Sequence, residues 1–129
     1  MTNLSYISPF FIVKNLQLAT SFYVEQLGFE IQFISPGAHP VFAIVGRDNI
    51  AIFLKEIGME VLPKPNHTVH AYARWDAYIS TQDPDCLYHE FQQKKLGFHK
   101  PLQDDEDGLR GFEMADADGY ILFFGRPKN

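Results

Sequence analysis

The chain has few of the features that direct a protein out of the cell or into a membrane. Cys86 is its single cysteine, which excludes an intramolecular disulfide. No run of about 18 apolar residues occurs that would serve as a membrane-spanning helix. Residues 1–5 lack the charged and apolar regions of a secretory signal peptide. We therefore expect a cytoplasmic protein with no membrane partner.

Basic residues are also scarce, since 11 Lys and Arg stand against 16 Asp and Glu, for a net charge of −5. An acidic protein repels nucleic acid, which argues against that partner, and weakly attracts cationic molecules. Aromatic residues, by contrast, are plentiful: 12 Phe, 6 Tyr and 1 Trp make up 15% of the 129 residues. Such residues either fill a core or line a pocket for a flat organic ligand.

A helix is predicted over residues 16–27. Asn15 before it is a favourable N-cap, and Gly28 after it suits the position just past a helix end. The segment has one apolar face, because apolar side chains recur at helical spacing. These are Leu16, Ala19, Tyr23 and Leu27.

The second half of the chain follows the same design. Asp83 is a suitable N-cap, Pro84 suits the first helical position, and Leu87 and Phe91 continue at fourfold spacing. A Leu-Gly-Phe triplet ends both predicted helices, beginning at Leu27 in the first half and 69 positions later in the second. The chain is therefore an internal duplication.

Each predicted helix is preceded by one strand-like segment and followed by three. In the first half these are Tyr6–Val13, Phe29–Ile34, Val41–Val45 and Ile50–Leu54. In the second half they are Arg74–Ser80, Phe98–Pro101, Gly111–Ala115 and Tyr120–Phe124. The pattern predicts two βαβββ modules joined by the Gly- and Pro-containing segment from Glu56 to Thr68. The acidic stretch from Gln103 to Gly108 is predicted to be a solvated loop.

Several motifs resemble the vicinal-oxygen-chelate superfamily, which includes glyoxalases, bleomycin-resistance proteins and extradiol dioxygenases. The first motif runs from Phe11–Leu16 through Ser21–Tyr23 to Leu27–Phe29. The second, Asp116–Gly125, is similar to the last hairpin of the family. Arg110–Phe112 resembles an Arg-Glu-Phe element of the metal-free bleomycin-resistance branch, with Gly111 in place of Glu.

The resemblance implies an α+β fold of two βαβββ modules, in which each sheet forms a half-barrel with its helix on the outer face. It places residues 1–129 in one such domain, with module 1 at 4–56, a linker at 57–72 and module 2 at 73–126. Members of the bleomycin-resistance branch are homodimers that sequester a cationic, aromatic-tailed drug, so a homodimer is expected here.

Metal-dependent members carry one His or Glu ligand on the first and last strands of each module. The resemblance places these positions at Ser8, Phe53, Asp76 and Phe123. A phenyl ring has no lone pair to donate, and one carboxylate with one hydroxyl holds a transition metal poorly. We therefore predict no metal, no cofactor and no catalytic residue, and interpret the histidines as surface or edge residues.

An aromatic pocket is predicted in place of the metal site. Its rings would stack on a planar ligand, while Asp76, together with Glu113 if it points inward, would pair with a positive charge. The candidate ligand-binding residues are Ser8, Phe10, Phe33, Phe42, Phe53, Trp75, Asp76, Tyr78, Glu113 and Phe123.

Three functions stay open at this point. The leading hypothesis is a metal-free homodimer that sequesters a small aromatic ligand, with a cationic group as an option, for example in antibiotic resistance. The second is an enzyme of the same superfamily, a lyase, isomerase or dioxygenase, acting with or without a metal. The third is a non-catalytic homodimer whose core fills the cavity.

Overall fold

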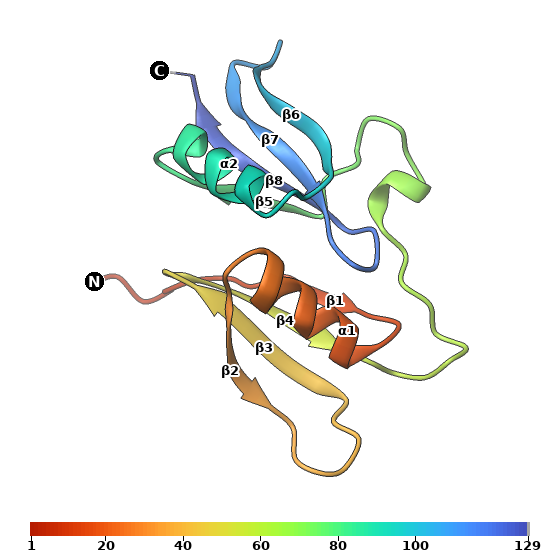
Figure 1. The fold of residues 1–129 in the computed structure, drawn as a ribbon. Coiled ribbons are helices and arrows are strands. Elements are labelled where there is room, and N and C mark those ends of the chain that lie inside the picture. The colour runs from red at the N-terminus through yellow and green to blue at the C-terminus, as the bar shows by residue number, and fades with distance from the viewer. Residues whose placement is uncertain (129) are drawn as a thin grey trace. The chain divides into compact units, whose positions relative to one another are not determined.

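The computed structural model describes residues 1–128, and the chain divides into two compact units. Unit 1 is Met1–Leu62, and unit 2 begins at Pro63. Each unit is a four-stranded sheet with a helix packed on one face (Figure 1). The α+β class and the two modules with one sheet each are confirmed. Among the described residues no helix is long and apolar enough to cross a membrane.

Unit 1 has its strands in the order β1-β4-β3-β2, with β1 parallel to β4 and the other pairs antiparallel. Its elements are β1 (Phe10–Ile12), α1 (Leu16–Ser21), the π-helical turn η1 (Phe22–Gln26), β2 (Glu30–Ile34), β3 (Phe42–Arg47) and β4 (Ile50–Lys55).

Unit 2 repeats this topology in the order β5-β8-β7-β6, with β5 parallel to β8. Its elements are the 3₁₀ turn η2 (Asn66–Thr68), β5 (Ala77–Ser80), α2 (Pro84–Gln93), β6 (Phe98–Asp104), β7 (Leu109–Ala115) and β8 (Ile121–Pro127). Part of the segment predicted as a linker is attached to this unit, because Asn66 N donates to Asp76 and the His67 ring lies 2.9 Å from the carbonyl oxygen of Gly119.

The two sheets also share a strand register. Phe53 on β4 and Phe123 on β8 occupy equivalent positions, each flanked by one residue of the parallel strand and one of the antiparallel strand. The flanking pairs are Phe10 and Ile44 around Phe53, and Tyr78 and Glu113 around Phe123. Because side chains alternate along a strand, all six lie on the sheet face away from the helix.

The core of each unit lies between the helix and the sheet. In unit 2 the Phe91 ring of α2 packs edge-on against Phe112 and Phe124, which stack on each other at 5.4 Å. In unit 1 the corresponding buried residues are aliphatic on the sheet and aromatic at the helix exit: Ala43, Val45, Ile52, Leu54, Tyr23 and Phe29. Removal of these apolar side chains from water, at about 25 cal/mol per Å², is what holds each helix on its sheet.

The N-caps are confirmed, since Asn15 accepts a hydrogen bond from Leu18 N and Asp83 from Cys86 N. The helix predicted over residues 16–27 is confirmed as far as Gln26, with α-helical geometry up to Ser21 and a π-helical turn from Phe22 that the sequence did not predict. Over a single turn, α- and π-helical geometry bring the same apolar side chains to the core, so hydrophobic spacing does not separate them. Gly28 has the expected positive φ of 75°, whereas after α2 Lys95 takes this conformation.

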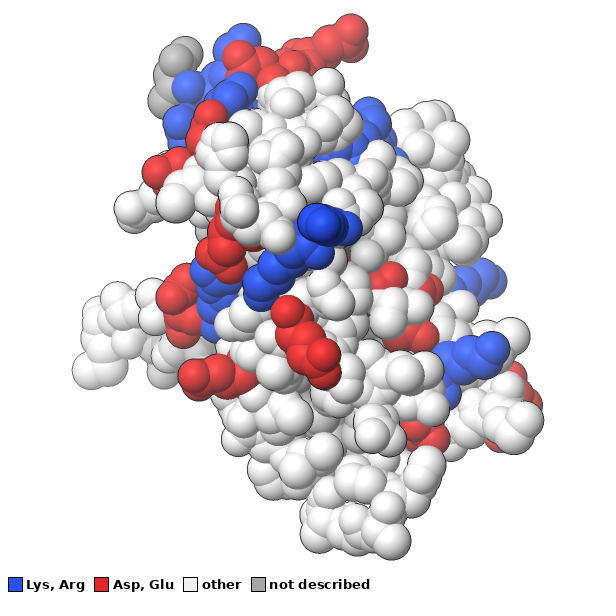
Figure 2. Space-filling view, viewed as in Figure 1, with Lys and Arg blue, Asp and Glu red and all other residues white. Residues whose placement is uncertain are grey.

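The two opening strands are shorter than predicted. Phe10 begins β1 directly after Pro9, which lacks the N–H needed to extend the ladder. In unit 2, Arg74 and Trp75 direct their side chains to Glu113 rather than extending β5. Figure 2 shows acidic and basic side chains interspersed over the surface in view, without one large patch of a single sign.

Candidate functional site

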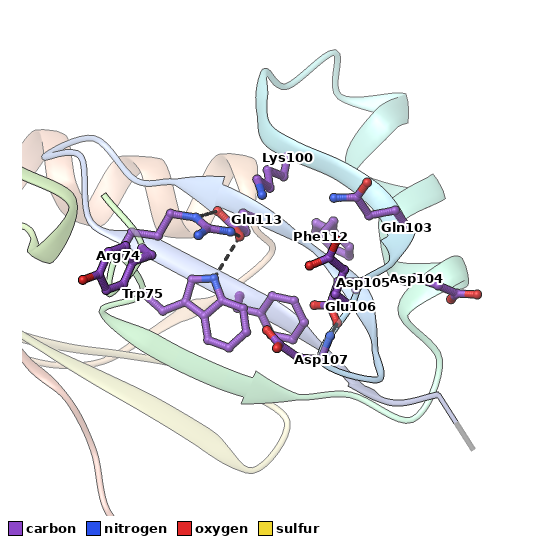
Figure 3. Close-up of a pocket in the computed structure, with 13 residues that line it drawn as sticks. Arg74, Trp75, Lys100, Gln103, Asp104, Asp105, Glu106, Asp107, Phe112 and Glu113 are labelled. Atoms are coloured by element: carbon purple, nitrogen blue, oxygen red, sulfur yellow. Dashed lines mark hydrogen bonds and ion pairs between the residues drawn. The ribbon is translucent and has the colours of Figure 1, made fainter. Parts of the chain in front are cut away.

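Unit 2 contains a pocket of about 490 Å³ on the sheet face away from α2 (Figure 3). Its walls come from three places: the segment before β5, the β6–β7 hairpin, and the middle of β7 and β8. The residues from these places are Tyr72, Arg74 and Trp75; Lys100 and Gln103–Asp107; and Gly111–Glu113 with Phe123.

An aromatic stack lies at the pocket wall. The Trp75 indole is stacked on the Phe123 ring, with a centroid distance of 4.1 Å and an interplanar angle of 20°. Tyr78 stacks against the same phenyl ring at 5.4 Å. Phe123 is only 3% exposed, so these neighbours hold it in one orientation.

Two glycines provide the space for this ring. A Cβ atom at Gly111 or at Gly125 would lie 2.6 Å from the Phe123 ring, closer than van der Waals contact permits. The two glycines are paired across β7 and β8. Phe123 therefore lies flat over a section of sheet that has no side chains on this face.

Glu113 is the central polar group of the wall and is 2% exposed. It accepts hydrogen bonds from Arg74 Nε at 3.0 Å, from Arg74 Nη2, from Trp75 Nε1 at 2.9 Å and from His99 Nδ1 at 2.9 Å. Four donors use the lone pairs of both carboxylate oxygens. Glu113 thus joins residues from before β5, from β6 and from β7.

The hydrogen bonds between Glu113 and its donors shift the pKa values of Glu113 and Arg74. Burial acts to raise the pKa of Glu113, but the hydrogen bonds from Arg74, Trp75 and His99 outweigh burial and lower the pKa below its ordinary value. The hydrogen bond with Glu113 in turn raises the pKa of Arg74. Both groups are therefore charged at neutral pH.

The turn between β6 and β7 forms an acidic rim of the pocket, made of Asp105, Glu106 and Asp107. In Figure 3 this rim lies across the pocket from Arg74. Asp105 Oδ1 accepts the N–H groups of Asp107 and Leu109, which fixes the turn. Within residues 1–128 the carboxylates of Glu106 and Asp107 accept no hydrogen bond, so their charge is available to a ligand.

Arg110 attaches the end of β6 to α2. Its guanidinium donates to Asp85 at 2.7 and 2.8 Å and to Asp104 at 3.0 Å. The bidentate contact with Arg110 lowers the pKa of Asp85. This network supports the hairpin from behind the pocket.

The five predicted site residues of unit 2 divide into two groups. Trp75, Glu113 and Phe123 line the pocket, and Tyr78 supports Phe123 from beside it. Asp76 does not line the pocket, because its two oxygens accept the backbone N–H groups of Asn66 and Ile121.

The five predicted site residues of unit 1 form a different arrangement. Phe42 contacts Phe10, Phe33 and Phe53 with ring centroids 5.7 to 5.9 Å apart, so the equivalent sheet face is filled by phenyl rings. Ser8 lies just before β1, and its buried Oγ has no hydrogen-bond partner among residues 1–128.

Several residues of the pocket were not predicted from the sequence. Arg74 and Lys100 were in segments predicted to be strands, His99 was interpreted as a surface or edge histidine, and the acidic rim was predicted to be only a solvated loop. The available signal was Gly111, which departs from the Arg-Glu-Phe element and makes room for Phe123.

The donor groups do not fit a divalent metal. Phe53 and Phe123 have no lone pair to offer, which leaves Asp76, held by the backbone N–H groups of Asn66 and Ile121, as the single carboxylate of the set. In the described part of the chain no three His, Cys, Asp or Glu side chains gather into a set that could hold a metal ion.

Comparison with solved structures shows the same fold in proteins of low sequence identity. TnmS3, an antibiotic binding protein from Streptomyces sp. CB03234, has a TM-score of 0.65 and 18% identity, covering 98% of this chain and 99% of that chain. A glyoxalase-related enzyme from Clostridium phytofermentans has a TM-score of 0.74 and 12% identity, covering 98% and 97%.

The bleomycin-binding protein from bleomycin-producing Streptomyces verticillus, complexed with copper(II)-bleomycin, has a TM-score of 0.69 and 24% identity. That match covers 96% of this chain and 97% of the other. No curated protein sequence matches the chain. The family model for the Glyoxalase/Bleomycin resistance protein/Dioxygenase superfamily, however, matches residues 4–124. Because this match spans nearly the whole chain, the chain belongs to that superfamily.

Proposed function

We propose that the chain is a small-molecule binding protein that sequesters, without a metal, an aromatic ligand bearing a positive charge in the pocket of unit 2. The observation that carries this proposal is the Trp75–Phe123 stack, which is fixed by Glu113 at the wall of the pocket. A volume of about 490 Å³ lies in the usual range for small-molecule sites.

Each feature of the pocket has a distinct role in this proposal. The aromatic stack would bind a planar ring, with a gain of about 0.5–1.5 kcal/mol per ring pair beyond burial. Glu106 and Asp107 would attract the positive charge, because their carboxylates are accessible. Glu113 would hold the wall together rather than bind the cation, since its acceptor sites are already occupied.

The bleomycin-binding protein and the antibiotic-binding protein of the same fold support a ligand of this kind. We extend the proposal to a cytoplasmic homodimer with a role in antibiotic resistance. The exposed rings of Phe10 and Phe33, at 55% and 48%, support an association surface on unit 1. Light scattering of the purified protein measures its mass, and a monomer at all concentrations would contradict the dimer.

The binding experiment uses Trp75, the only tryptophan of the chain, as its reporter. Bleomycin, the planar cation proflavine and the planar anion anthracene-9-carboxylate are titrated while Trp75 fluorescence is followed. We expect quenching by proflavine, weakened at least about fivefold by Phe123→Leu because the stack is lost. The double substitution Glu106→Gln and Asp107→Asn should weaken the binding of proflavine but not that of anthracene-9-carboxylate.

The proposal fails if no probe binds below about 1 mM, which corresponds to about −4 kcal/mol. Equal affinity for the anionic and cationic dyes would contradict the proposed preference for a positive charge, but would still agree with an aromatic ligand. Asp48→Asn serves as a control for net charge, because Asp48 is an exposed residue of unit 1.

A second candidate function, an enzyme of the superfamily, is favoured by one contact. His99 Nδ1 is bonded to Glu113, which would leave Nε2 free to act as a base beside the pocket. The glyoxalase-related enzyme of the same fold is consistent with this. Turnover of a bound ligand that His99→Gln abolishes without loss of binding would favour the enzyme. A stoichiometric divalent ion in protein purified without chelator would favour a metalloenzyme.

A further inference from the structure

Unit 1 has a pocket of its own, of about 420 Å³, between the start of α1, the edge strand β2 and the loop before β3. It lies on the α1 side of the sheet, whereas the pocket of unit 2 lies on the face away from its helix. Its lining is apolar along β2, polar along the start of α1, and includes Glu56 beside His39.

The apolar wall consists of side chains that the fold leaves exposed. Ile31 and Ile34 are 47% and 45% exposed, although they lie on a strand beside the core helix. Ala38 and Pro40 of the following loop continue this wall. An aliphatic molecule in the pocket would cover these surfaces and remove them from water.

Glu56 has half of its acceptor capacity unused. Its Oε1 accepts the N–H of Leu16 at 2.8 Å, and its Oε2 lies 2.8 Å from His39 Nε2. A carboxylate has about four acceptor sites, so each oxygen can accept one more hydrogen bond. The hydrogen bonds from Leu16 and then from His39 lower the pKa of Glu56, which keeps it negatively charged at neutral pH.

The equivalent place in unit 2 has no carboxylate. There the helix begins at Pro84, which has no N–H to satisfy, and the residue equivalent to Glu56, three positions after the central phenylalanine, is Arg126. Arg126 donates to the carbonyl oxygen of Gln82 instead. The carboxylate is therefore specific to unit 1. The helix at this pocket also runs into the π-turn η1, a feature often found at functional sites.

From these observations we infer that the unit 1 pocket binds a small aliphatic amine. The hydrocarbon part lies against Ile31 and Ile34, and the ammonium group donates to the free acceptor sites of Glu56. The His39 ring, 77% exposed, lies at the pocket mouth and can turn aside to admit the ligand. This site is independent of the aromatic pocket of unit 2.

Cyclohexylamine, cyclohexanol and cyclohexanecarboxylate are matched probes for the experiment, since they share one ring and differ in charge. Each is titrated into the uniformly ¹⁵N-labelled full chain, and backbone amide shifts are followed by NMR. We expect cyclohexylamine to shift Leu16 and Ile34 with a Kd on the order of 1 mM. Cyclohexanol should bind about fivefold more weakly, and the carboxylate should not bind.

Glu56→Gln keeps an acceptor for Leu16 N but removes the charge, so it should make the affinities for amine and alcohol equal. Ile34→Phe fills the pocket and should weaken both probes. The inference is overturned if wild type binds amine and alcohol equally, if no probe shifts these amides, or if Glu56→Gln leaves the preference unchanged. Shifts confined to Trp75 and its neighbours would also overturn it, while agreeing with the site in unit 2.

Discussion

Units 1 and 2 place different side chains at equivalent positions of the same sheet. Where unit 1 has Phe42, unit 2 has Gly111, and where unit 1 has Ile44, unit 2 has Glu113. In unit 1 the ring of Phe42 packs on Phe53 and fills the face. In unit 2 the missing side chain lets the Phe123 ring lie flat over Gly111 and Gly125, and Trp75 stacks on it.

The comparison shows how a duplicated fold acquires two unlike cavities. The register of β1, β4 and β3 matches that of β5, β8 and β7, so in these strands the units differ in side-chain volume and in the number of hydrogen-bond donors nearby. Glu113 is accommodated because Arg74, Trp75 and His99 supply those donors. The equivalent Ile44 lies between Phe33 and Phe53 in the sheet, and its apolar side chain needs no hydrogen-bond donor.

The largest expected effect comes from removing the buried carboxylate. Glu113→Leu should lower the free energy of unfolding by about 3 kcal/mol, because the charge of Arg74 loses its partner. The reverse exchange, Ile44→Glu, should cost about 2 kcal/mol, because no donor satisfies the new carboxylate. Urea denaturation measures both. If Ile44→Glu leaves the free energy of unfolding unchanged, the hydrogen-bond donors around Glu113 do not explain why unit 2 has a carboxylate where unit 1 has isoleucine.

An intermediate effect is expected from closing the space under Phe123. Gly111→Ala should cost about 2 kcal/mol and weaken proflavine binding, because the new methyl group displaces the ring. Phe42→Ala is the matched change in unit 1. It should cost a similar amount, about 2 kcal/mol, by opening the phenyl cluster, but leave proflavine binding unchanged. If both Gly111→Ala and Phe42→Ala abolish proflavine binding, the binding site does not lie in unit 2 alone.

The smallest effect is a change in the pH dependence of stability. The folded-state pKa of Glu113 lies below its ordinary value of 4.5, so the ionised group stabilises the fold fully above pH 4.5. That stabilisation is lost as the pH falls through the lowered folded pKa. Glu113→Gln should therefore flatten the stability profile in acid, measured by thermal unfolding at a series of pH values. Glu56→Gln should flatten it less, since Glu56 is closer to solvent; an equal effect would contradict this ranking.

The duplication could be predicted from the sequence because caps, turns and alternation are local signals. Asn15 and Asp83 marked both helix starts, and the constant offset between the halves was enough to place Phe53 and Phe123 at equivalent positions. Glu113 was a candidate because it lies in the middle of a predicted strand, and Trp75 because it adjoins Asp76, a position that the family resemblance implied.

The polar network around Glu113 could not be predicted in the same way. The register of β6 shifts on both sides of Lys100, and His99 reaches Glu113 within this irregular stretch, against simple alternation. Arg74 reaches Glu113 from irregular backbone, across 39 positions of sequence. Such contacts form between residues that only the folded sheet brings together, so residue spacing alone does not predict them.

Those long sequence separations have a consequence for the order of folding. The hydrogen bonds of Glu113 to Arg74 and Trp75 span 39 and 38 positions, so the chain must close large loops before they form. We expect them to be absent from the folding transition state. Substitutions at Glu113 would then accelerate unfolding and leave the folding rate nearly unchanged. The hydrogen bonds of the pocket wall would therefore slow the unfolding of unit 2 without helping it to fold.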